Sequence, residues 1–321
     1  MIYNNILELI GNTPLVKINK LNPNPKVTLL AKLEFFNPGG SIKDRIGLAM
    51  IESAEKSKKL TKNGIIIEAT GAGNTGLGLV MTAAVKGYKT IMVIPDKVSE
   101  EKRNLLRAYG AKVVVAPTAV PPEDERSYYK VTEKLVKEIH NAFQPDQYNN
   151  LDNPKAHFMT TGPEIWKETK GKVTHVVVGM GTGGTITGIG KYLKKKNPKI
   201  KIIGVDPIGS IFYQYFKTGK YPKRLKTWKM EGIGEDFIPK TMDFSIVDQV
   251  VLVSDRQAFL TARKLAKSEG ILAGGTSGAA LYAAQQISKK LENDLVVIIF
   301  PDSGRSYLSK FYNDEWINKN I

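Results

Sequence analysis

The chain has 321 residues, 42% of them hydrophobic and 24% charged, which suits about two globular domains and excludes a wholly disordered chain. It contains no cysteine, which excludes disulfides, thiolate metal sites, cysteine-ligated haem or iron–sulfur clusters and a cysteine nucleophile. Its 47 basic and 31 acidic residues give a net charge of +16, which raises nucleic acid as a candidate partner.

The first half of the chain alternates short apolar runs with helical patterns. In chain order we expect a strand at 65–67, a helix at 75–86, a strand at 90–94, a helix at 99–109 and a strand at 112–115. Ser99 is a suitable N-cap for the second helix, and Gly110 follows its end. This βαβαβ order implies a parallel sheet with helices on its faces.

The same alternation restarts after Asn153-Pro154. The expected elements are a strand at 175–178, a helix at 185–196, strands at 201–205 and 250–253, helices at 256–268 and 277–291, and a strand at 295–299. We therefore predict an α/β protein with two parallel-sheet domains and a boundary near residues 145–155.

The positive charge is mostly spread along the chain, with its densest clusters at 194–196 and 217–229. The first cluster ends a predicted helix, where the helix dipole favours cations, and the second contains Gly219 and Pro222, which are typical of an exposed loop. We find no zinc finger, RNP-type aromatic motif or basic zipper, so a lysine-rich solvated surface is favoured over a nucleic-acid site.

No apolar run approaches the ~18 residues of a membrane span, and residues 1–5 lack the layout of a signal peptide. A cytoplasmic protein that binds neither membrane nor nucleic acid is the expectation. The three histidines, His140, His157 and His175, lack metal-ligand spacing, so we predict no metal site and expect these residues on the surface or in packing.

Four glycine-rich turns carry hydroxyl or amide side chains. They lie at 37–41, 71–76, 179–185 and 274–278. The last three fall between a strand or loop and a helix, where backbone N–H groups bind anions and glycine lets a ligand approach closely. Together they indicate a site at the carboxyl ends of parallel strands.

The turn at 179–184 also fits the dinucleotide fingerprint Gly-x-Gly-x-x-Gly, and Asp206 ends the next strand at the spacing of a ribose-binding acid. A dehydrogenase is therefore an alternative. Hydroxyls at Thr182 and Thr185 favour a compact phosphomonoester instead, and the fingerprint leaves the segment 41–45 without a role. Lys43 in that segment is a candidate for a Schiff base with an aldehyde; the alternative is an ordinary surface lysine.

Several segments together resemble the pyridoxal-phosphate (PLP) β-replacement family, which contains cystathionine β-synthase and cysteine synthase. The most specific is Asn-Pro-Gly-Gly-Ser-Ile-Lys-Asp-Arg at 37–45; the others lie at 10–15, 32–34, 73–76 and 181–185. Segments 204–207, 231–239 and 301–303 resemble cystathionine β-synthase more than cysteine synthase. The resemblance runs from about residue 8 to the C-terminus, and under it Asp206 is a structural residue at a strand end.

The resemblance implies fold type II, the architecture of the tryptophan synthase β subunit, with PLP in a cleft between two domains. A smaller mobile domain, 46–148, would carry the substrate loop, and a larger domain, 1–45 with 149–321, would carry the PLP lysine and the phosphate loop. It also implies a homodimer. Because only the catalytic core is matched, we expect neither the haem-binding arm nor the regulatory module of animal cystathionine β-synthases.

The resemblance also assigns site residues. Lys43 would bind PLP covalently and act as the base, Asn74 would donate to the PLP ring oxygen, and Thr276 would face the pyridine nitrogen. The phosphate would be held by Gly181, Thr182, Gly183, Gly184 and Thr185. The substrate would contact Thr70, Gly73, Asn74, Thr75 and Gln147, and Glu231 would act beside it. The substrate loop has one residue more than the family's Thr-Ser-Gly-Asn-Thr and lacks its serine, which affects the contact expected from Thr70 most.

The implied reaction replaces the β-substituent of serine, or of an activated serine, with a thiol. Homocysteine would give cystathionine, which the three specific segments favour, and sulfide would give cysteine. A lyase that releases hydrogen sulfide from cysteine is a third candidate with the same chemistry. A nucleic-acid-binding protein is the alternative from a different class.

Overall fold

The structure is a computed structural model that describes residues 2–71, 73–96, 98–121, 123–222 and 224–321. The chain divides into two compact units: unit 1 comprises Met1–Ile10 and Asn37–Asp152, and unit 2 comprises Gly11–Phe36 and Asn153–Ile321. Lys43 thus lies in unit 1, whereas the sequence prediction assigns residues 1–45 to the larger domain. The functional division into a mobile domain and a larger one stays a prediction.

Unit 1 contains a parallel sheet with the strand order β5-β4-β3-β6 in its described residues. The strands are β3 (Ile65–Ala69), β4 (Lys89–Pro95), β5 (Lys112–Ala116) and β6 (Ala142–Phe143). The helices are η1 (Ile6–Leu9), α1 (Lys43–Lys56), α2 (Asn74–Lys86), α3 (Glu100–Ala108) and α4 (Tyr128–Glu138). The predicted βαβαβ order is confirmed in β3-α2-β4-α3-β5, and Ser99 caps α3 by accepting the backbone N–H of Lys102.

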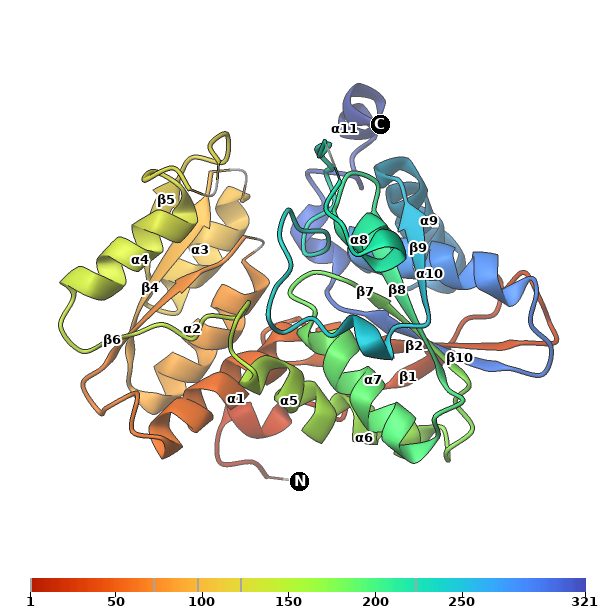
Figure 1. Ribbon diagram of the computed structural model, residues 1–321, viewed down its shortest axis with the longest axis horizontal. Coiled ribbons are helices and arrows are strands. Elements are labelled where there is room, and N and C mark those ends of the chain that lie inside the picture. The colour runs from red at the N-terminus through yellow and green to blue at the C-terminus, as the bar shows by residue number, and fades with distance from the viewer. Residues whose placement is uncertain (1, 72, 97, 122, 223) are drawn as a thin grey trace. The chain divides into compact units, whose positions relative to one another are not determined.

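Helices α1 and α2 lie side by side (Figure 1). A Cβ atom on Gly47 would lie 2.5 Å from the carbonyl carbon of Gly78, and one on Gly78 would lie 2.6 Å from the carbonyl oxygen of Lys43. Only glycine permits backbones to approach this closely. The start of α1, where Lys43 lies, is therefore fixed against α2.

Unit 2 contains a mixed sheet with the strand order β1-β2-β10-β7-β8-β9 in its described residues, in which β1 runs antiparallel to β2 and the other pairs are parallel. The strands are β1 (Leu15–Lys17), β2 (Thr28–Leu33), β7 (His175–Gly179), β8 (Lys201–Pro207), β9 (Gln249–Val253) and β10 (Leu295–Phe300). The α-helices are α5 (Asp152–Met159), α6 (Thr161–Glu168), α7 (Gly184–Lys196), α8 (Phe212–Thr218), α9 (Asp255–Glu269), α10 (Gly275–Ser288) and α11 (Asp314–Asn320). Short 3-10 helices occur at η2 (Glu34–Phe36), η3 (Phe244–Ile246) and η4 (Gly304–Tyr307).

The core of unit 2 lies between this sheet and the neighbouring helices α9 and α10 (Figure 1). A Cβ atom on Gly278 would lie 2.1 Å from the carbonyl oxygen of Ala258, so these two helices also touch backbone to backbone. Phe259 of α9 stacks on Phe311 with ring centroids 4.6 Å apart. This packing fixes α10, whose first turn carries Thr276.

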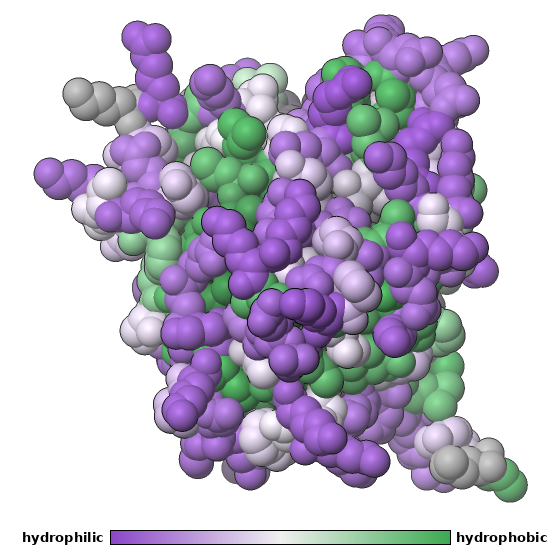
Figure 2. Space-filling view, turned by 90° about the vertical axis from the view of Figure 1, so that its right-hand side faces the viewer, coloured by the Kyte–Doolittle hydropathy of each residue, from purple (hydrophilic) through white to green (hydrophobic). Residues whose placement is uncertain are grey.

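Hydrophilic residues predominate on the face shown in Figure 2, with smaller hydrophobic areas between them. In the basic cluster at 194–196, Lys194 forms an ion pair with Asp248, with Nζ 2.8 Å from Oδ2. Within the described part of the chain, no helix is long and apolar enough to cross a membrane. No group of three or more histidine, aspartate or glutamate side chains there is arranged to hold a metal ion.

Candidate functional site

The turn between β7 and α7 excludes side chains at two consecutive positions. Gly183, the N-cap of α7, has a φ of 83°, and a Cβ atom there would lie 2.5 Å from Cβ of Met242. A Cβ atom on Gly184 would lie 1.9 Å from Oδ1 of the buried Asn153. Glycine is thus required at both positions because neighbouring atoms approach closely, and at Gly183 also because the backbone is left-handed.

The same turn offers hydrogen-bond donors to an anion. Helical geometry leaves the N–H groups of the first turn of α7 without carbonyl partners inside the helix, and the helix dipole adds positive potential there. The hydroxyls of Thr182 and Thr185 flank these N–H groups, and Asn153 Nδ2 donates to Thr182 Oγ1 at 3.2 Å. A phosphate group, with several acceptor oxygens and negative charge, fits this donor set.

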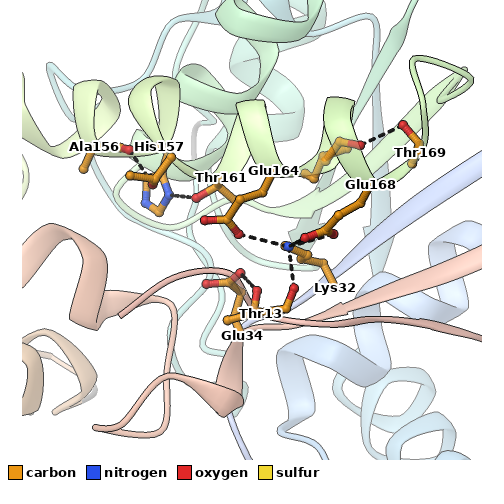
Figure 3. Close-up of polar contacts among 11 residues, drawn as sticks. Thr13, Lys32, Glu34, Ala156, His157, Thr161, Glu164, Glu168 and Thr169 are labelled. Carbon is orange, nitrogen blue, oxygen red and sulfur yellow. Dashed lines mark hydrogen bonds and ion pairs between the residues drawn. The ribbon is translucent and has the colours of Figure 1, made fainter. Parts of the chain in front are cut away.

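His157 on α5 is a member of this region that sequence analysis did not single out. The side chain is fully buried, and its Nδ1 atom lies 2.9 Å from Thr161 Oγ1 (Figure 3). Its Nε2 atom lies 3.2 Å from Thr185 Oγ1. His157 is buried, as expected of a packing residue, and it also contacts a hydroxyl of the turn at 181–185. Its short-range sequence context contains no signal for this contact.

Three predicted site segments of unit 2 meet at the start of α10. Thr276 Oγ1 donates to the carbonyl oxygen of Glu231 at 2.9 Å. A Cβ atom on Gly179 would lie 2.8 Å from Cγ2 of Thr276, and one on Gly181 would lie 2.6 Å from the carbonyl oxygen of Gly232. The turn at 179–185, the segment 231–234 and Thr276 are thus in contact within unit 2.

The Glu231 side chain forms an ion pair with Lys310, and both groups are largely buried. Nearby, Tyr307 donates its hydroxyl to Asp302 Oδ2 at 2.6 Å. Burial raises the pKa of Tyr307 well above its usual range, and the negative charges of Asp302 and Glu231 raise it further. The segments 231–239 and 301–303, both singled out from the sequence, therefore contribute to one charged cluster, and Lys310 is a member that the sequence did not indicate.

In unit 1, Lys43 begins α1 directly after a tight turn. Gly40 has a φ of 85° and donates its N–H to the carbonyl oxygen of Asn37 at 2.8 Å. Ser41 Oγ accepts the N–H of Lys43 at 3.2 Å, and Asp44 Oδ2 accepts the N–H of Gly39 at 2.6 Å. These local bonds fix the backbone from which the Lys43 side chain projects.

The predicted substrate loop of unit 1 leads into α2. Gly73 is the N-cap with a φ of 82°, which parallels Gly183 at α7, and Asn74 is the first helical residue. Thr75 Oγ1 donates to Gln147 Oε1 at 2.6 Å, so these two predicted substrate contacts lie together. Thr70 Oγ1 accepts the N–H of Gly76 at 3.4 Å, which directs this hydroxyl at the first turn of α2.

Two segments before Lys43 that carry the family resemblance, 10–15 and 32–34, have a structural role. Lys32 is fully buried, with Nζ 3.0 Å from Glu164 Oε2 and 2.8 Å from Glu168 Oε1 (Figure 3). Glu34 Oε1 accepts the hydroxyl of Thr13 at 2.6 Å. Through Thr13, Lys32 and Glu34, these segments therefore bind each other and α6 within unit 2.

Asp206 at the end of β8 serves α8. Its Oδ2 atom accepts the N–H of Tyr213 at 2.8 Å, and burial raises its pKa to about 7. These contacts fit the structural role that the resemblance implies better than that of a ribose ligand.

Comparison with known proteins agrees with this geometry. A family model described as pyridoxal-phosphate dependent enzyme matches residues 6–302. The chain belongs to this family. The predicted α/β fold and PLP as the cofactor of the family are thereby confirmed.

Similar proteins of this family include two cystathionine β-synthases. The one from Saccharomyces cerevisiae is 45% identical over 328 residues, which cover 98% of this chain and 64% of that protein. The one from Mus musculus is 47% identical over 315 residues, which cover 97% of this chain and 56% of that protein. The chain thus spans less than two thirds of these relatives.

Two solved structures of the family are similar over 96% of this chain, each with a TM-score of 0.88. One is a hydrogen sulfide-producing enzyme from Fusobacterium nucleatum, 40% identical and matched over its whole length. The other is a cysteine synthase from Entamoeba histolytica, 35% identical and matched over 90% of its length.

The residues present fit the family's cofactor. PLP carries a phosphate, for which the turn at 181–185 supplies N–H and hydroxyl donors, and that turn is closed to side chains at Gly183 and Gly184. It also carries an aldehyde, for which a lysine at a fixed backbone position is the natural partner. When bound, PLP withdraws electrons from the Cα atom of an amino acid and stabilises negative charge there.

Proposed function

We propose that this protein catalyses PLP-dependent β-replacement on serine or an activated serine, with homocysteine as the thiol and cystathionine as the product. The observation that carries the choice of thiol is the cluster in which Glu231 and Asp302 lie together, because both come from the segments typical of cystathionine β-synthases. The identity of 45–47% to enzymes of that name supports it.

The roles of unit 1 follow from its local geometry. We propose that Lys43 Nζ holds PLP covalently until the substrate amine takes its place, then accepts the Cα proton and returns it to the departing β-group. Asn74 would donate its amide to the ring oxygen. Thr75 and Gln147 would hold the substrate carboxylate, and the 2.6 Å contact between their side chains supports a shared ligand. Gly73 and Thr70 would shape the loop.

In unit 2, the residues 181–185 would hold the phosphate, and Thr276 would lie at the pyridine nitrogen. Thr276 is neutral, and its hydroxyl donates to the Glu231 carbonyl oxygen in this structure. A neutral partner leaves the ring less electron-poor than a carboxylate would, which favours rapid loss of the β-group over long-lived negative charge at Cα.

Similar solved structures support two alternative reactions with the same chemistry, cysteine synthesis and hydrogen sulfide release. A cysteine synthase and a hydrogen sulfide-producing enzyme share the fold at a TM-score of 0.88. With sulfide as the acceptor the product would be cysteine, and with cysteine as the donor hydrogen sulfide would leave. Nucleic-acid binding rests on the net charge alone and predicts salt-dependent retention on DNA by a protein without visible absorbance.

The test is product analysis by mass spectrometry on PLP-loaded enzyme. Serine, O-acetylserine and cysteine are each supplied alone, with homocysteine and with sulfide. We expect cystathionine to form fastest, from serine or its ester with homocysteine. Faster formation of cysteine with sulfide would favour cysteine synthase, and sulfide release from cysteine alone would favour the lyase.

Glu231→Gln should separate the two thiols. A carboxylate beside the second substrate can accept the ammonium group of homocysteine or assist ionisation of its thiol, whereas sulfide has no ammonium group and ionises more readily. We expect the rate with homocysteine to fall roughly 10–100-fold, as for a hydrogen bond to a charged group, and the rate with sulfide to fall less. Steady-state rates with both thiols measure this difference.

The alternative for Glu231 is a bracing role, which its ion pair with Lys310 also suits. Bracing predicts a lower melting temperature and equal losses with both thiols. Glu315→Gln, which removes an exposed carboxylate from α11, is the matched control. Equal losses, or a larger loss with sulfide, would remove Glu231 from the acceptor site.

We also propose a cytoplasmic homodimer. The large apolar side chains exposed near the N-terminus, Ile2, Tyr3, Ile6 and Leu9, support a second copy as partner, because exposed apolar groups in one short segment favour burial. Light scattering on the purified protein should give the mass of two chains; the mass of one chain would exclude this proposal.

A further inference from the structure

Glu68 is a buried carboxylate on β3 that the proposed reaction does not use. The residue is 1% exposed, on a strand that pairs with β4 at Glu68 and with β6 at Ile65 and Ile66. Its Oε2 atom accepts the N–H of Asp146 at 2.8 Å, and its Oε1 atom accepts the N–H of Gln147 at 3.1 Å. One carboxylate therefore binds two consecutive backbone N–H groups of a single turn.

The turn that Glu68 binds has an unfavourable backbone conformation. Asp146 has a φ of 53°, in the left-handed region that residues other than glycine rarely adopt. Such a conformation persists where surrounding bonds hold it. The Asp146 carboxylate accepts from Asn149 Nδ2 at 3.0 Å, and Glu68 supplies the bonds from the sheet side.

Gln147 extends this network to the start of α2. Its Nε2 atom donates to the carbonyl oxygen of Ala69 at 3.2 Å, and its Oε1 atom accepts the hydroxyl of Thr75 at 2.6 Å. Gln147 and Thr75 are each 3% exposed, so neither has room to shift independently. Displacement of the turn at 146–147 would move both side chains.

We propose that Glu68 is a positioning residue that holds Gln147 and Thr75 in the geometry needed to bind the carboxylate of the amino-acid substrate. The inference rests on the proposed function, because that function makes Gln147 and Thr75 substrate contacts. Glu68 itself touches the turn and not the substrate.

The protonation state of Glu68 gives this role a pH dependence. Burial raises the pKa of Glu68 from 4.5 to about 8, the two backbone N–H bonds oppose this rise, and the negative charge of Asp146 adds to it. Helices α2 and α4 also pack against β3, and Met92 of β4 lies opposite Glu68 in the sheet. Among the described residues, Asp146 is the charged group whose interaction raises the pKa of Glu68. Both carboxylate oxygens accept fully only in the ionised form, so the turn is held best above about pH 8.

Rising pH should strengthen substrate binding through Glu68 but lower the contribution of Glu68 to the stability of the fold. The folded protein keeps the Glu68 proton up to about pH 8, whereas the unfolded chain releases it near 4.5. Between these values the folded state binds more protons, so the contribution of Glu68 to the free energy of unfolding falls as pH rises. Above about pH 8 this contribution is constant.

The test compares wild type, Glu68→Gln and Glu133→Gln as PLP-loaded enzymes. Glutamine keeps the size of Glu68, but one of its two terminal atoms is an amide NH2 group, which donates where the second backbone N–H needs an acceptor. It therefore mimics the neutral carboxyl group. Glu133→Gln removes an exposed carboxylate of α4 in the same unit. The measurements are kcat and KM for serine from pH 6.5 to 9.5, and amide hydrogen exchange at Asp146 and Gln147.

We expect Glu68→Gln to raise the KM for serine about tenfold at pH 9, with little change in kcat or PLP content. Near pH 6.5 the KM of the variant should approach that of the wild type. Exchange at the Asp146 and Gln147 amides should quicken in the variant at pH 9, while Glu133→Gln matches wild type throughout. A ratio of wild-type to Glu68→Gln kcat/KM that does not change with pH would overturn the proposal, as would unchanged exchange.

Two further measurements complete the test. If Glu68→Gln does not fold, amide protection at Asp146 and Gln147 in the wild type, corrected for intrinsic exchange, should increase through about pH 8; constant protection would overturn the proposal.

Gln147→Ala distinguishes failure of the positioning role of Glu68 from failure of the proposed substrate site. If it raises the KM and Glu68→Gln does not, the positioning role is wrong and the substrate site stands. If neither variant raises the KM, the substrate site of the proposed function is wrong and the inference falls with it.

Discussion

Lys43→Ala should abolish turnover and leave the protein without covalently bound cofactor. Alanine retains the start of α1, so the fold should survive, while the group proposed to hold PLP and to move the Cα proton is removed. Positioned acid–base groups contribute about 10²–10⁴-fold to rates, and loss of the covalent attachment adds to this. Absorbance after borohydride treatment and denaturation measures the cofactor that remains on the chain.

Lys56→Ala is the matched control, because it removes an exposed lysine from the last turn of the same helix. It should retain colour, attachment and activity. Retention of borohydride-fixed cofactor by Lys43→Ala would show that another lysine holds the cofactor. Loss of folding, monitored by circular dichroism, would instead show that Lys43 is structural.

Gly183→Ala should both destabilise unit 2 and weaken PLP binding. Its φ of 83° costs a residue with a side chain about 1–2 kcal/mol, and the new Cβ atom would lie 2.5 Å from Cβ and 2.7 Å from Cα of Met242. Since backbone cannot yield as a flexible side chain does, the turn itself must shift, and with it the N–H groups proposed to hold the phosphate. Thermal unfolding and PLP titration of the apoenzyme measure the two effects.

Gly270→Ala isolates the backbone contribution. Gly270 has a φ of 72° at the end of α9, and a Cβ atom there would have no neighbour within 4 Å. This variant should lose stability comparable to the backbone cost alone and bind PLP as wild type does. A Gly183→Ala protein with wild-type affinity for PLP would contradict the assignment of residues 181–185 to the phosphate.

The strands and helices of both units were largely predictable because their signals are local. The helix expected at 256–268 spans Asp255–Glu269, with a capping box formed by Ser254 and Gln257. The helix expected at 277–291 ends at Ser288 instead. Asn24 explains the difference, because its Nδ2 atom donates to the carbonyl oxygens of Ser288 and Leu291 at 2.8 and 2.9 Å, and this distant side chain satisfies the end of the helix early.

Strand β2 is not among the strands expected from the sequence, and its run contains the charged residue Lys32. A charged residue in the run Thr-Leu-Leu-Ala-Lys-Leu argues against a buried strand, and its acceptors Glu164 and Glu168 lie far away in the sequence. One of the two neighbours of β2 in the sheet, β10, comes from the other end of the chain. Pairings over such separations carry no local pattern.

In the candidate site, too, local features were predictable from the sequence and distant contacts were not. Turns such as Gly183–Thr185 were predictable, since glycine with a hydroxyl before a helix has a local physical meaning. The side chains that hold these turns, His157 at Thr185 and Glu68 at Gln147, were not predictable, because their partners lie 28 and 79 positions away in the sequence. Buried polar residues require their partners to be known before their role can be stated.

The measurement that tests the account most directly is peptide mapping of the wild-type enzyme after borohydride reduction. Mass spectrometry of the digested protein locates the reduced cofactor on one of the many lysines of the chain. The account predicts the label on Lys43, in the peptide that contains Gly39 and Asp44. A label on any other lysine, or no label on a yellow and active enzyme, would contradict it.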